Sequence, residues 1–194
     1  AAFTVLPNTG EIRIGAATAG TSGNYNTEIM SRNGGNLITS IKADAYGRVT
    51  KPLQPAFACN GHSGTTTLNT NASDIDIPFD SVVYNIGNHY NSSNSRFTAP
   101  VAGRYFFYTE TMLQSNVSGT WDYMIISFKK NGGATQIENM LPKPGGGSYA
   151  SATVTTILEL AAGDYVTVWM RQAGGSANVV IRNGFRQFIG YFLG

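Results

Sequence analysis

One run of strand length in this sequence is apolar on both sides, and this feature limits the folds open to the chain. Tyr105 and Phe107 occupy one parity of the run. Phe106, Tyr108 and Met112 occupy the other parity. Side chains of a strand alternate between the two faces of its sheet, so both faces would carry large apolar groups. Because a two-layer sandwich buries only one of these faces, we predict that sister chains cover the other.

The runs 121–128 and 188–193 are also apolar on both parities. A typical monomer exposes no apolar patch larger than about 300–600 Å². Covering about 600–1,000 Å² of outer-face side chains would contribute roughly 15–25 kcal/mol before the costs of association. This magnitude predicts obligate assembly, although the alternation alone does not fix the number of subunits.

The rest of the sequence predicts an all-β fold. Short runs rich in Val, Ile, Thr, Tyr and Phe are separated by Gly, Asn and Pro clusters, as is typical of a sandwich or barrel. No window of ten or more residues has helical periodicity. Asn131-Gly132 between two apolar runs is a strong hairpin signal. In the larger, C-terminal part of the chain we expect strands near 54–60, 75–79, 81–86, 95–99, 103–114, 121–130, 134–139, 150–160, 164–172 and 184–193.

Two regions differ in their apolar content. Residues 1–53 are poor in large apolar groups and cannot bury enough surface to fold alone. We therefore expect this segment to be a β-rich neck, either disordered or paired with copies of itself in an intertwined assembly. Aromatic density rises from Phe57 onward, and residues 54–194 are predicted to form the head domain.

Composition excludes several classes of function. Only 12% of the residues are charged, the net charge is +2, and no concentrated basic stripe suggests nucleic-acid binding. Cys59 is the single cysteine, so intrachain disulfides and Cys/His metal sites are excluded. No apolar run approaches the roughly 18 residues of a membrane span, so we expect no membrane insertion.

The candidate catalytic residues are few. His62 and His89 are the only histidines, and neither accompanies a nucleophile motif. A glycan depolymerase would need paired carboxylates, and no pair stands out among the 11 acidic residues. Trp121 and Trp169 could stack on sugars, but their alternating strands favour packing. We therefore predict a protein that is not an enzyme.

One acidic segment keeps a metal site open. Asp74, Asp76 and Asp80 share one parity of 73–80, while apolar residues occupy the other. A solvated strand face is the simpler interpretation, because no calcium-loop motif follows. In an assembly these carboxylates could converge, so calcium remains possible and no other cofactor is expected.

Residues 97–107 read FTAPVAGRYFF and strongly resemble the globular head of complement component one q, a tumour-necrosis-factor-like jelly roll. Further motifs follow the family's order over about residues 54–194: YNIGNHY at 84–90, KKNG at 129–132, LEL at 158–160, GDYV at 163–166 and FIGYFL at 188–193. The resemblance implies a ten-stranded jelly roll that forms a homotrimer around a three-fold axis. It also implies recognition of proteins or glycans, with calcium in some heads.

The resemblance implies that ten residues define the fold and the trimer. They are Phe97, Gly103, Tyr105, Phe107, Gly163, Asp164, Phe188, Gly190, Tyr191 and Leu193. We expect Asp164 to accept hydrogen bonds from backbone amides in its turn. No ligand-binding residue is predicted.

The segments 8–15 (NTGEIRIG) and 44–52 (DAYGRVTKP) resemble repeats that precede trimeric tips in bacteriophage tail fibres and other virion proteins. They imply a virion location, on a tail fibre or capsid surface, with the neck joined to a larger assembly. We therefore predict a trimeric virion head that binds a host-surface protein or glycan. The alternatives are a purely structural capsid or decoration protein, a secreted recognition protein of the same fold and, as the weakest, a glycan depolymerase.

Overall fold

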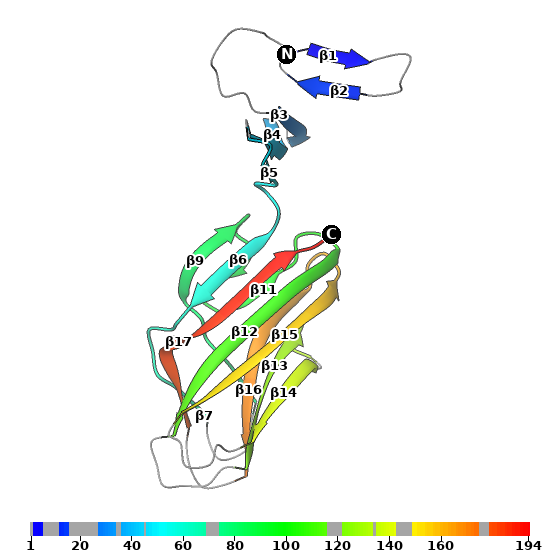
Figure 1. Ribbon diagram of the computed structural model, residues 1–194. Coiled ribbons are helices and arrows are strands. Elements are labelled where there is room, and N and C mark those ends of the chain that lie inside the picture. The colour runs from blue at the N-terminus through cyan, green and yellow to red at the C-terminus, as the bar shows by residue number, and fades with distance from the viewer. Residues whose placement is uncertain are drawn as a thin grey trace. The chain divides into compact units, whose positions relative to one another are not determined.

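The computed structural model describes residues 2–5, 12–15, 27–33, 36–44, 46–68, 74–115, 122–133, 135–142, 149–174 and 179–194 (Figure 1). Strands are the only regular elements among these residues. Contacts along the chain divide it into two units, residues 1–54 and 55–194. Within the described residues, no helix has the length and apolarity needed to cross a membrane.

The first unit contains two small antiparallel sheets. Strands β1 (Ala2–Val5) and β2 (Ile12–Gly15) form one pair. Strands β3 (Thr27–Asn33), β4 (Asn36–Ala43) and β5 (Val49–Thr50) form the other sheet. These strands pair within one chain. That copies of this segment intertwine in an assembly stays a prediction. Pairing two strands that follow each other in the sequence closes only a short loop, so it costs little conformational entropy.

Side chains of the first unit lie near the surface. None of those described over residues 28–54 is buried, and Ile29, Met30, Tyr46, Val49 and Leu53 are exposed. Strand pairing here gives the backbone N–H and C=O groups hydrogen-bond partners, but it does not build an apolar core. This agrees with the low apolar content of the sequence.

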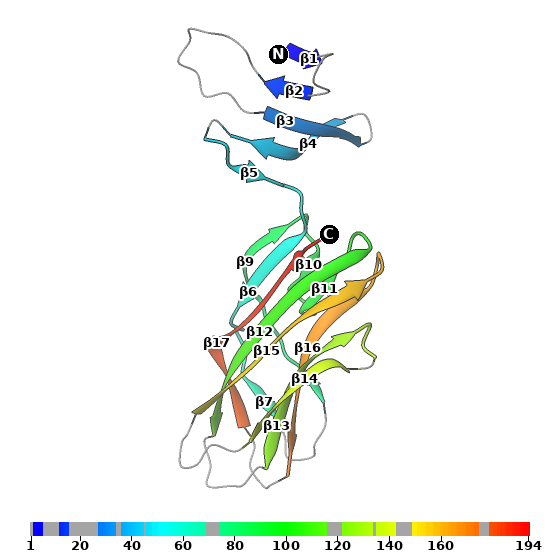
Figure 2. The ribbon, with the colours of Figure 1, turned by 45° about the vertical axis from the view of Figure 1, so that its right-hand side comes forward.

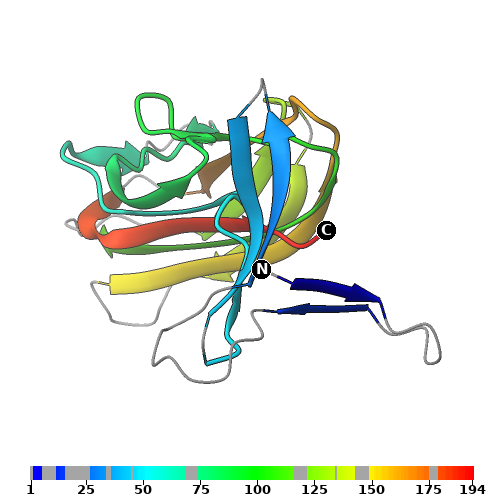
Figure 3. The same cartoon turned by 90° about the horizontal axis from the view of Figure 1, so that it is seen from above.

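The second unit is a sandwich of two antiparallel sheets, each with a path of five strands and one short extra strand. The sheet that we call the β12 sheet runs in the order β15 (Tyr149–Leu160), β12 (Gly103–Ser115), β17 (Val179–Phe192), β6 (Ala56–Asn60) and β9 (Ser81–Ile86), and β7 (Thr66–Leu68) pairs with β17. The sheet that we call the β16 sheet runs in the order β10 (Tyr90–Asn91), β11 (Arg96–Thr98), β16 (Tyr165–Ala173), β13 (Tyr123–Lys130) and β14 (Thr135–Pro142), and β8 (Ile75–Asp76) pairs with β16. Figure 2 and Figure 3 show the sandwich from two further directions.

This architecture confirms the predicted jelly roll, and the two five-strand paths together supply its ten strands. Every strand predicted in the head has a counterpart in the structure. Sequence analysis missed the short strands β7 and β10 and placed the start of the last strand at 184 instead of Val179. Two or three residues are too few to show an alternating pattern, which explains the missed strands.

Aromatic rings fill the space between the sheets. Phe57 lies at the centre, stacked on Tyr90 at 4.7 Å and on Phe97 at 5.0 Å between ring centroids. Phe188 meets the edge of Phe57 at 4.8 Å. These rings come from four strands in both sheets, so the core itself joins the two layers.

One part of the two-faced prediction is wrong. Ile125 and Trp169 lie on the parity that faces away from the central core cluster, yet they are only 5% and 2% exposed. Lys129 and Arg171 lie over the Trp169 ring, with the Lys129 Nζ 4.8 Å from its centroid. The chain itself therefore covers this region and needs no sister subunit there. Trp169 is a packing residue, and Trp121 lies outside the described residues.

Candidate functional site

The outer face of the β12 sheet carries an exposed apolar patch. Register places Phe106 of β12 between Ile157 of β15 and Tyr191 of β17. The Phe106 and Tyr191 rings pack with centroids 5.0 Å apart, while Ile157 is 57% exposed and Tyr191 41% exposed. Ile189 and Tyr84 extend the patch across β17 and β9. We call Tyr84, Phe106, Ile157, Ile189 and Tyr191 the face patch.

A second apolar surface lies on a different side of the same subunit. Strand β14 is the edge of the β16 sheet, and it exposes Ile137 and Met140, the latter at 60%. The Asn139 Nδ2 donates to the Thr153 carbonyl at 2.8 Å and so ties this edge to β15 of the other sheet. Ile137 pairs with Phe128 and Met140 pairs with Ile125, so the two side chains lie on opposite faces of this edge strand. We call these two exposed residues of β14, Ile137 and Met140, the edge patch. It presents apolar side chains on the edge strand, where an uncovered sheet is open to further association.

The outer face changes from apolar to polar along β12. Tyr108 Oη donates to Glu110 Oε2 at 2.9 Å, and Gln187 Nε2 donates to the same oxygen at 3.3 Å. Burial, and then the Glu110 carboxylate, raise the pKa of the Tyr108 phenol, so this hydroxyl stays a donor. Asn60 of β6 lies beside Gln187 in the pairing between β6 and β17.

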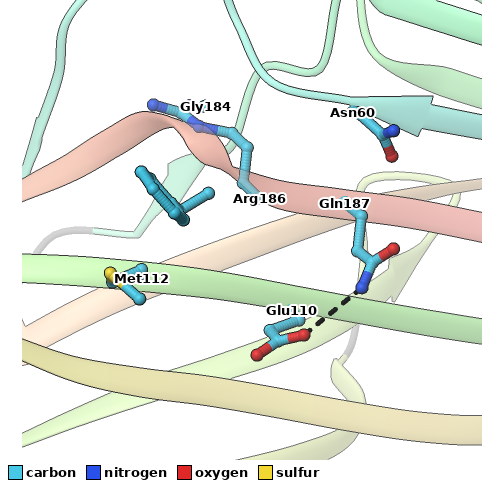
Figure 4. A pocket seen from close by; sticks show the side chains of 7 residues that line it. Asn60, Glu110, Met112, Gly184, Arg186 and Gln187 are labelled. Atoms are coloured by element: carbon cyan, nitrogen blue, oxygen red, sulfur yellow. Dashed lines mark hydrogen bonds between the residues drawn. The ribbon is translucent and has the colours of Figure 1, made fainter.

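A hollow of about 270 Å³ opens at this polar position. Its lining residues are Asn60, Glu110, Met112, Gly184, Phe185, Arg186 and Gln187. In Figure 4 the Glu110 and Gln187 side chains point toward each other, while the Arg186 side chain extends away from them. The hollow is thus lined by one carboxylate, two amides, two apolar side chains, Gly184 and Arg186.

An excursion of β17 supplies one wall of the hollow. Thr111 pairs with Arg186 and Leu113 pairs with Ile181, so residues 182–185 have no counterpart on β12 except Met112. Phe185 in this excursion is 53% exposed. The Arg182 guanidinium lies 4.8 Å from the Phe185 ring centroid.

Arg186 holds the excursion in place from inside the sandwich. Its side chain is 3% exposed, and burial lowers its pKa to about 10. The guanidinium donates to five oxygens, those of the Arg182, Ile181 and Pro78 carbonyls and of the Thr66 and Asn183 side chains. Among the described residues no carboxylate forms an ion pair with it.

The predicted aromatic residues lie in the core. Phe97, Tyr105, Phe107 and Phe188 are all fully buried. The Tyr105 hydroxyl donates to the Val101 carbonyl at 2.7 Å, so its polar atom is satisfied near the strand end. Tyr191 and Leu193, in contrast, are exposed on the subunit.

Two of the three predicted glycines lie where a Cβ would clash, and the third has a backbone conformation that favours glycine. At Gly103, with φ +150°, a Cβ would stand 2.6 Å from Phe192 Cε2. Gly190 is crowded by the rings of Phe57 and Phe107. Gly163 has φ +90°, a conformation that favours glycine.

Asp164 anchors the turn that joins β15 to β16. Its Oδ2 accepts from the Ala161 amide at 2.7 Å and pairs with Lys130 Nζ at 2.7 Å. Its Oδ1 accepts from Asn131 Nδ2 at 2.7 Å. The Lys130 and Asn131 donors, with the Ala161 amide, lower the pKa of this carboxyl to about 2. Asp164 thus links its own turn to the hairpin at Lys130–Asn131.

The structure does not bring the three candidate calcium ligands together. Asp74 pairs with Lys129 at 3.3 Å and with Arg171 at 3.7 Å. Asp76 accepts from Thr167 at 3.4 Å, whereas Asp80 pairs with His62. Across the described part of the chain, no three Asp, Glu, His or Cys side chains form a metal-binding group.

Ser63, His62 and Asp80 lie together without forming a catalytic relay. His62 Nδ1 lies 3.0 Å from Asp80 Oδ2, and the Ser63 hydroxyl donates to that same oxygen at 2.6 Å. A triad requires the serine to donate to the histidine, which in turn is oriented by the carboxylate. Here both donors share the carboxylate, and these hydrogen bonds, with Ser63 first, lower its pKa.

Comparison with known proteins identifies the fold family. The model of the C1q domain matches residues 56–193. The chain belongs to the C1q domain family. Its C1q domain coincides closely with the second unit, whereas the match leaves residues 1–55 uncovered. The predicted resemblance of the head to complement component one q is thereby confirmed.

Curated relatives include two animal proteins. Complement C1q and tumor necrosis factor-related protein 9A of Homo sapiens is 33% identical over 109 residues, which are 54% of this chain and 28% of the relative. Complement C1q tumor necrosis factor-related protein 3 of Mus musculus is 32% identical over 117 residues, which are 60% of this chain and 44% of the relative. The chain therefore spans less than half of the length of either relative.

Solved structures agree with the fold. Murine APRIL aligns with a TM-score of 0.53 at 15% identity and covers 72% of this chain and 99% of its own. Eiger TNF from S. frugiperda aligns with a TM-score of 0.50 at 14% identity and covers 73% of this chain and 94% of its own. At such identities the likeness establishes the jelly-roll fold alone.

Sequence analysis of the C1q domain did not select the residues of the hollow. Glu110 was nevertheless detectable, because it interrupts the apolar parity of Phe106, Tyr108 and Met112 on β12. Gln187 and Phe185 carried no comparable signal. They join Glu110 only through the pairing of β12 with β17 and the excursion at 182–185.

Proposed function

We propose that this chain is a recognition protein that is not an enzyme and whose C1q domains assemble as a homotrimer. The observation that carries the proposal is the presence of two different apolar surfaces on one subunit, the face patch and the edge patch. Large apolar side chains gathered at an exposed surface mark sites of protein association. The face patch includes two aromatic residues whose rings pack together, the half-buried Phe106 and the exposed Tyr191.

The two surfaces favour a ring. Self-complementary contacts in a two-fold dimer use the same patch on both subunits, whereas a contact between unlike patches is heterologous and closes into a ring when the rotation allows. In such a ring the edge patch of each subunit would contact the face patch of its neighbour. Both patches of every subunit would then be covered. The resemblance to complement component one q heads implies that the ring holds three subunits.

The polar groups of the described residues favour binding over catalysis. Ser63 and His62 both donate to Asp80 and form no nucleophile–base pair. Exposed loops and surface hollows remain as the sites that could recognise a protein or glycan. The ligand-binding role is thus assigned to the surface of the C1q domain.

The comparisons favour the secreted alternative over the virion appendage. The curated relatives are animal proteins named for complement C1q and tumor necrosis factor, and the family model does not extend into the segment that resembles tail-fibre repeats. We therefore propose a recognition protein that acts outside the cell. The virion fibre reading would be supported instead by finding the chain on purified particles.

The first unit is proposed to act as a neck. It has no buried described side chain, and it exposes Ile29, Met30 and Leu53. Association of three necks would cover these groups, as the head's apolar patches are covered. The neck would then link the head to whatever larger assembly carries it.

Sedimentation of two complementary variants tests the assembly. Tyr191→Glu charges the face patch, and Met140→Glu charges the edge patch. The wild type should sediment as a trimer at micromolar concentration, and each variant alone as a monomer. A mixture of both variants should give dimers. The unaltered face patch of the Met140→Glu variant can bind the unaltered edge patch of the Tyr191→Glu variant, and the two charged patches stop further growth. As a control, Val101→Glu alters an exposed apolar residue outside both patches and should remain trimeric. A stable wild-type monomer would overturn the proposal.

A further inference from the structure

We propose that Asn91 is an attachment site for an N-linked glycan, which would stand on a side of the C1q domain that the subunit contacts leave open. Residues 91–93 read Asn-Ser-Ser, the acceptor pattern Asn-x-Ser with a residue other than proline in the middle. Asn71 and Asn116 begin two further triplets of this pattern, and both lie outside the described residues. The modification is made on chains that enter a secretory pathway, so this proposal rests on the proposed extracellular function.

The Asn91 side chain holds its oxygen in a turn. The Ser93 amide donates to Asn91 Oδ1 at 3.0 Å, and the Ser93 hydroxyl donates to the same oxygen at 2.7 Å. Because a backbone amide can only donate, the side-chain atom that it contacts must be the oxygen, so the amide nitrogen Nδ2 takes the other position. Nδ2 donates to none of the described residues. The nitrogen that would carry the sugar is thus available for reaction.

This turn needs no tertiary contact. Both hydrogen bonds join residues two positions apart in the sequence. An asparagine side chain that bonds the backbone two residues on forms an Asx turn, a local structure that a short segment can adopt by itself. The chain can therefore present Asn91 in this geometry before the domain has folded.

Transfer of the glycan would exchange one bond for another at Nδ2. The nitrogen forms a bond to the anomeric carbon of the oligosaccharide, and the bond between that carbon and a phosphate oxygen of a lipid pyrophosphate donor breaks. The lipid pyrophosphate leaves with the electron pair of that bond, and one Nδ2 proton passes to a base of the transferase. Oδ1 gains and loses no bond in this step, so it can still accept hydrogen bonds from Ser93.

Strand alternation directs Asn91 to the outer face of the β16 sheet. Tyr90, the preceding residue, is 4% exposed and belongs to the core between the sheets. Side chains of successive strand residues point to opposite faces, so Asn91 points outward, and it is exposed. In the pairing of β10 with β11 it lies opposite Arg96, which precedes the core residue Phe97 and so points outward too. The folded domain therefore leaves room for a glycan at this position.

This position lies away from both surfaces that the proposed trimer covers. The face patch occupies the outer face of the other sheet, and the edge patch lies on β14, at the opposite end of the β16 sheet from β10. Tyr84 is the face-patch residue closest to β10 in the sequence, and the next residue, Asn85, bonds the Tyr90 backbone. Since Tyr84 and Asn85 point to opposite faces of β9, Tyr84 points away from β10. A trimer can therefore carry a glycan on Asn91 of each subunit.

Secretion of the full chain from a eukaryotic host, behind a cleavable signal peptide, tests the site. Asn71→Gln and Asn116→Gln in every sample leave Asn91 at the head of the one remaining triplet. We expect that an N-glycan amidase shifts the secreted protein to a faster-migrating band, and that mass spectrometry finds residue 91 converted to aspartate. Ser93→Ala should abolish the shift because the acceptor triplet loses its hydroxyl, whereas Ser93→Thr keeps a hydroxyl and should retain it.

Asn94→Gln is the matched control, since it alters an exposed asparagine of the same turn that begins no acceptor triplet, and it should retain the shift. Mass spectrometry of the unaltered chain reports on residue 91 if the paired substitutions reduce secretion. Secreted protein that carries no glycan on Asn91, or a Ser93→Ala variant that keeps it, would overturn the proposal.

Sedimentation of the same protein before and after the amidase separates the glycan site from the proposed trimer. Both forms should be trimers. A trimer without a glycan on Asn91 overturns the glycan site alone, whereas a glycosylated protein that is monomeric in both forms overturns the trimer alone. A glycosylated monomer that becomes a trimer after the amidase would place Asn91 within a subunit contact and so overturn the position proposed for the glycan.

Discussion

Gly190 lies against the ring of Phe57 so closely that a Cβ on Gly190 would stand 2.6 Å from Phe57 Cε1. The ring of Phe107 crowds the same position at 2.7 Å. The central strand β17 thus passes beneath two rings of the core, one on each neighbouring strand. Glycine provides the space that lets these rings pack.

We expect Gly190→Ala to destabilise the C1q domain by about 1–3 kcal/mol, the usual cost of overpacking a core. Urea unfolding monitored by fluorescence and circular dichroism would measure it. Gly184→Ala is the matched control on the same strand, because a Cβ there would meet nothing within 4 Å. Equal stability of the two variants would contradict the packing argument.

Asp164→Ala should lower the thermal stability at neutral pH. Its carboxyl has a pKa of about 2 in the folded chain against 3.8 as the ordinary value, because Lys130, Asn131 and the Ala161 amide favour the charged form. A lowered folded pKa gives stability that is present above pH 3.8 and is lost as the pH falls through about 2.

The difference in Tm between wild type and Asp164→Ala should therefore shrink as calorimetry moves from pH 6 toward about 2. Glu159→Ala, which removes an exposed carboxylate of β15, should show little loss. A Tm difference that stays constant across this range would show that Asp164 acts without its charge.

Arg186→Lys should destabilise the domain by about 2–3 kcal/mol. A lysine cannot reproduce the planar fork that reaches five oxygens, including the Ile181 carbonyl at 2.8 Å and the Thr66 hydroxyl at 3.0 Å. Hydrogen exchange should increase first in residues 179–186, where those bonds hold the excursion. Arg104→Lys, at an exposed position on β12, should leave exchange unchanged.

Cys59 should resist thiol reagents in the folded protein. Its side chain is fully buried, and burial raises the pKa of the thiol to about 11. At pH 8 the reactive thiolate would be about a hundredfold scarcer than for an ordinary cysteine. Absorbance of the released thiol from a disulfide reagent should appear only after unfolding in guanidinium. Rapid reaction of the native chain would contradict the burial.

Sequence patterns located most of the strands because the relevant information is local. In β12 the alternation of Tyr105 and Phe107 against Phe106 and Tyr108 directly indicates a strand with two apolar faces. The pattern did not reveal what covers the outer face. At Ile125 the chain itself covers it, whereas Ile157 remains exposed. Alternation assigns a side chain to a face but does not identify its neighbours.

The sequence by itself determined the all-β class and the aromatic residues that form the core of the head, since a period of two and apolar density depend only on nearby residues. Tertiary structure alone decided which strands pair and which polar groups meet on the outer face. Glu110 and Gln187 are 77 residues apart in sequence and share a hydrogen bond only because β17 lies beside β12. Strand order and register depend on contacts between distant parts of the chain, and no local pattern contains them.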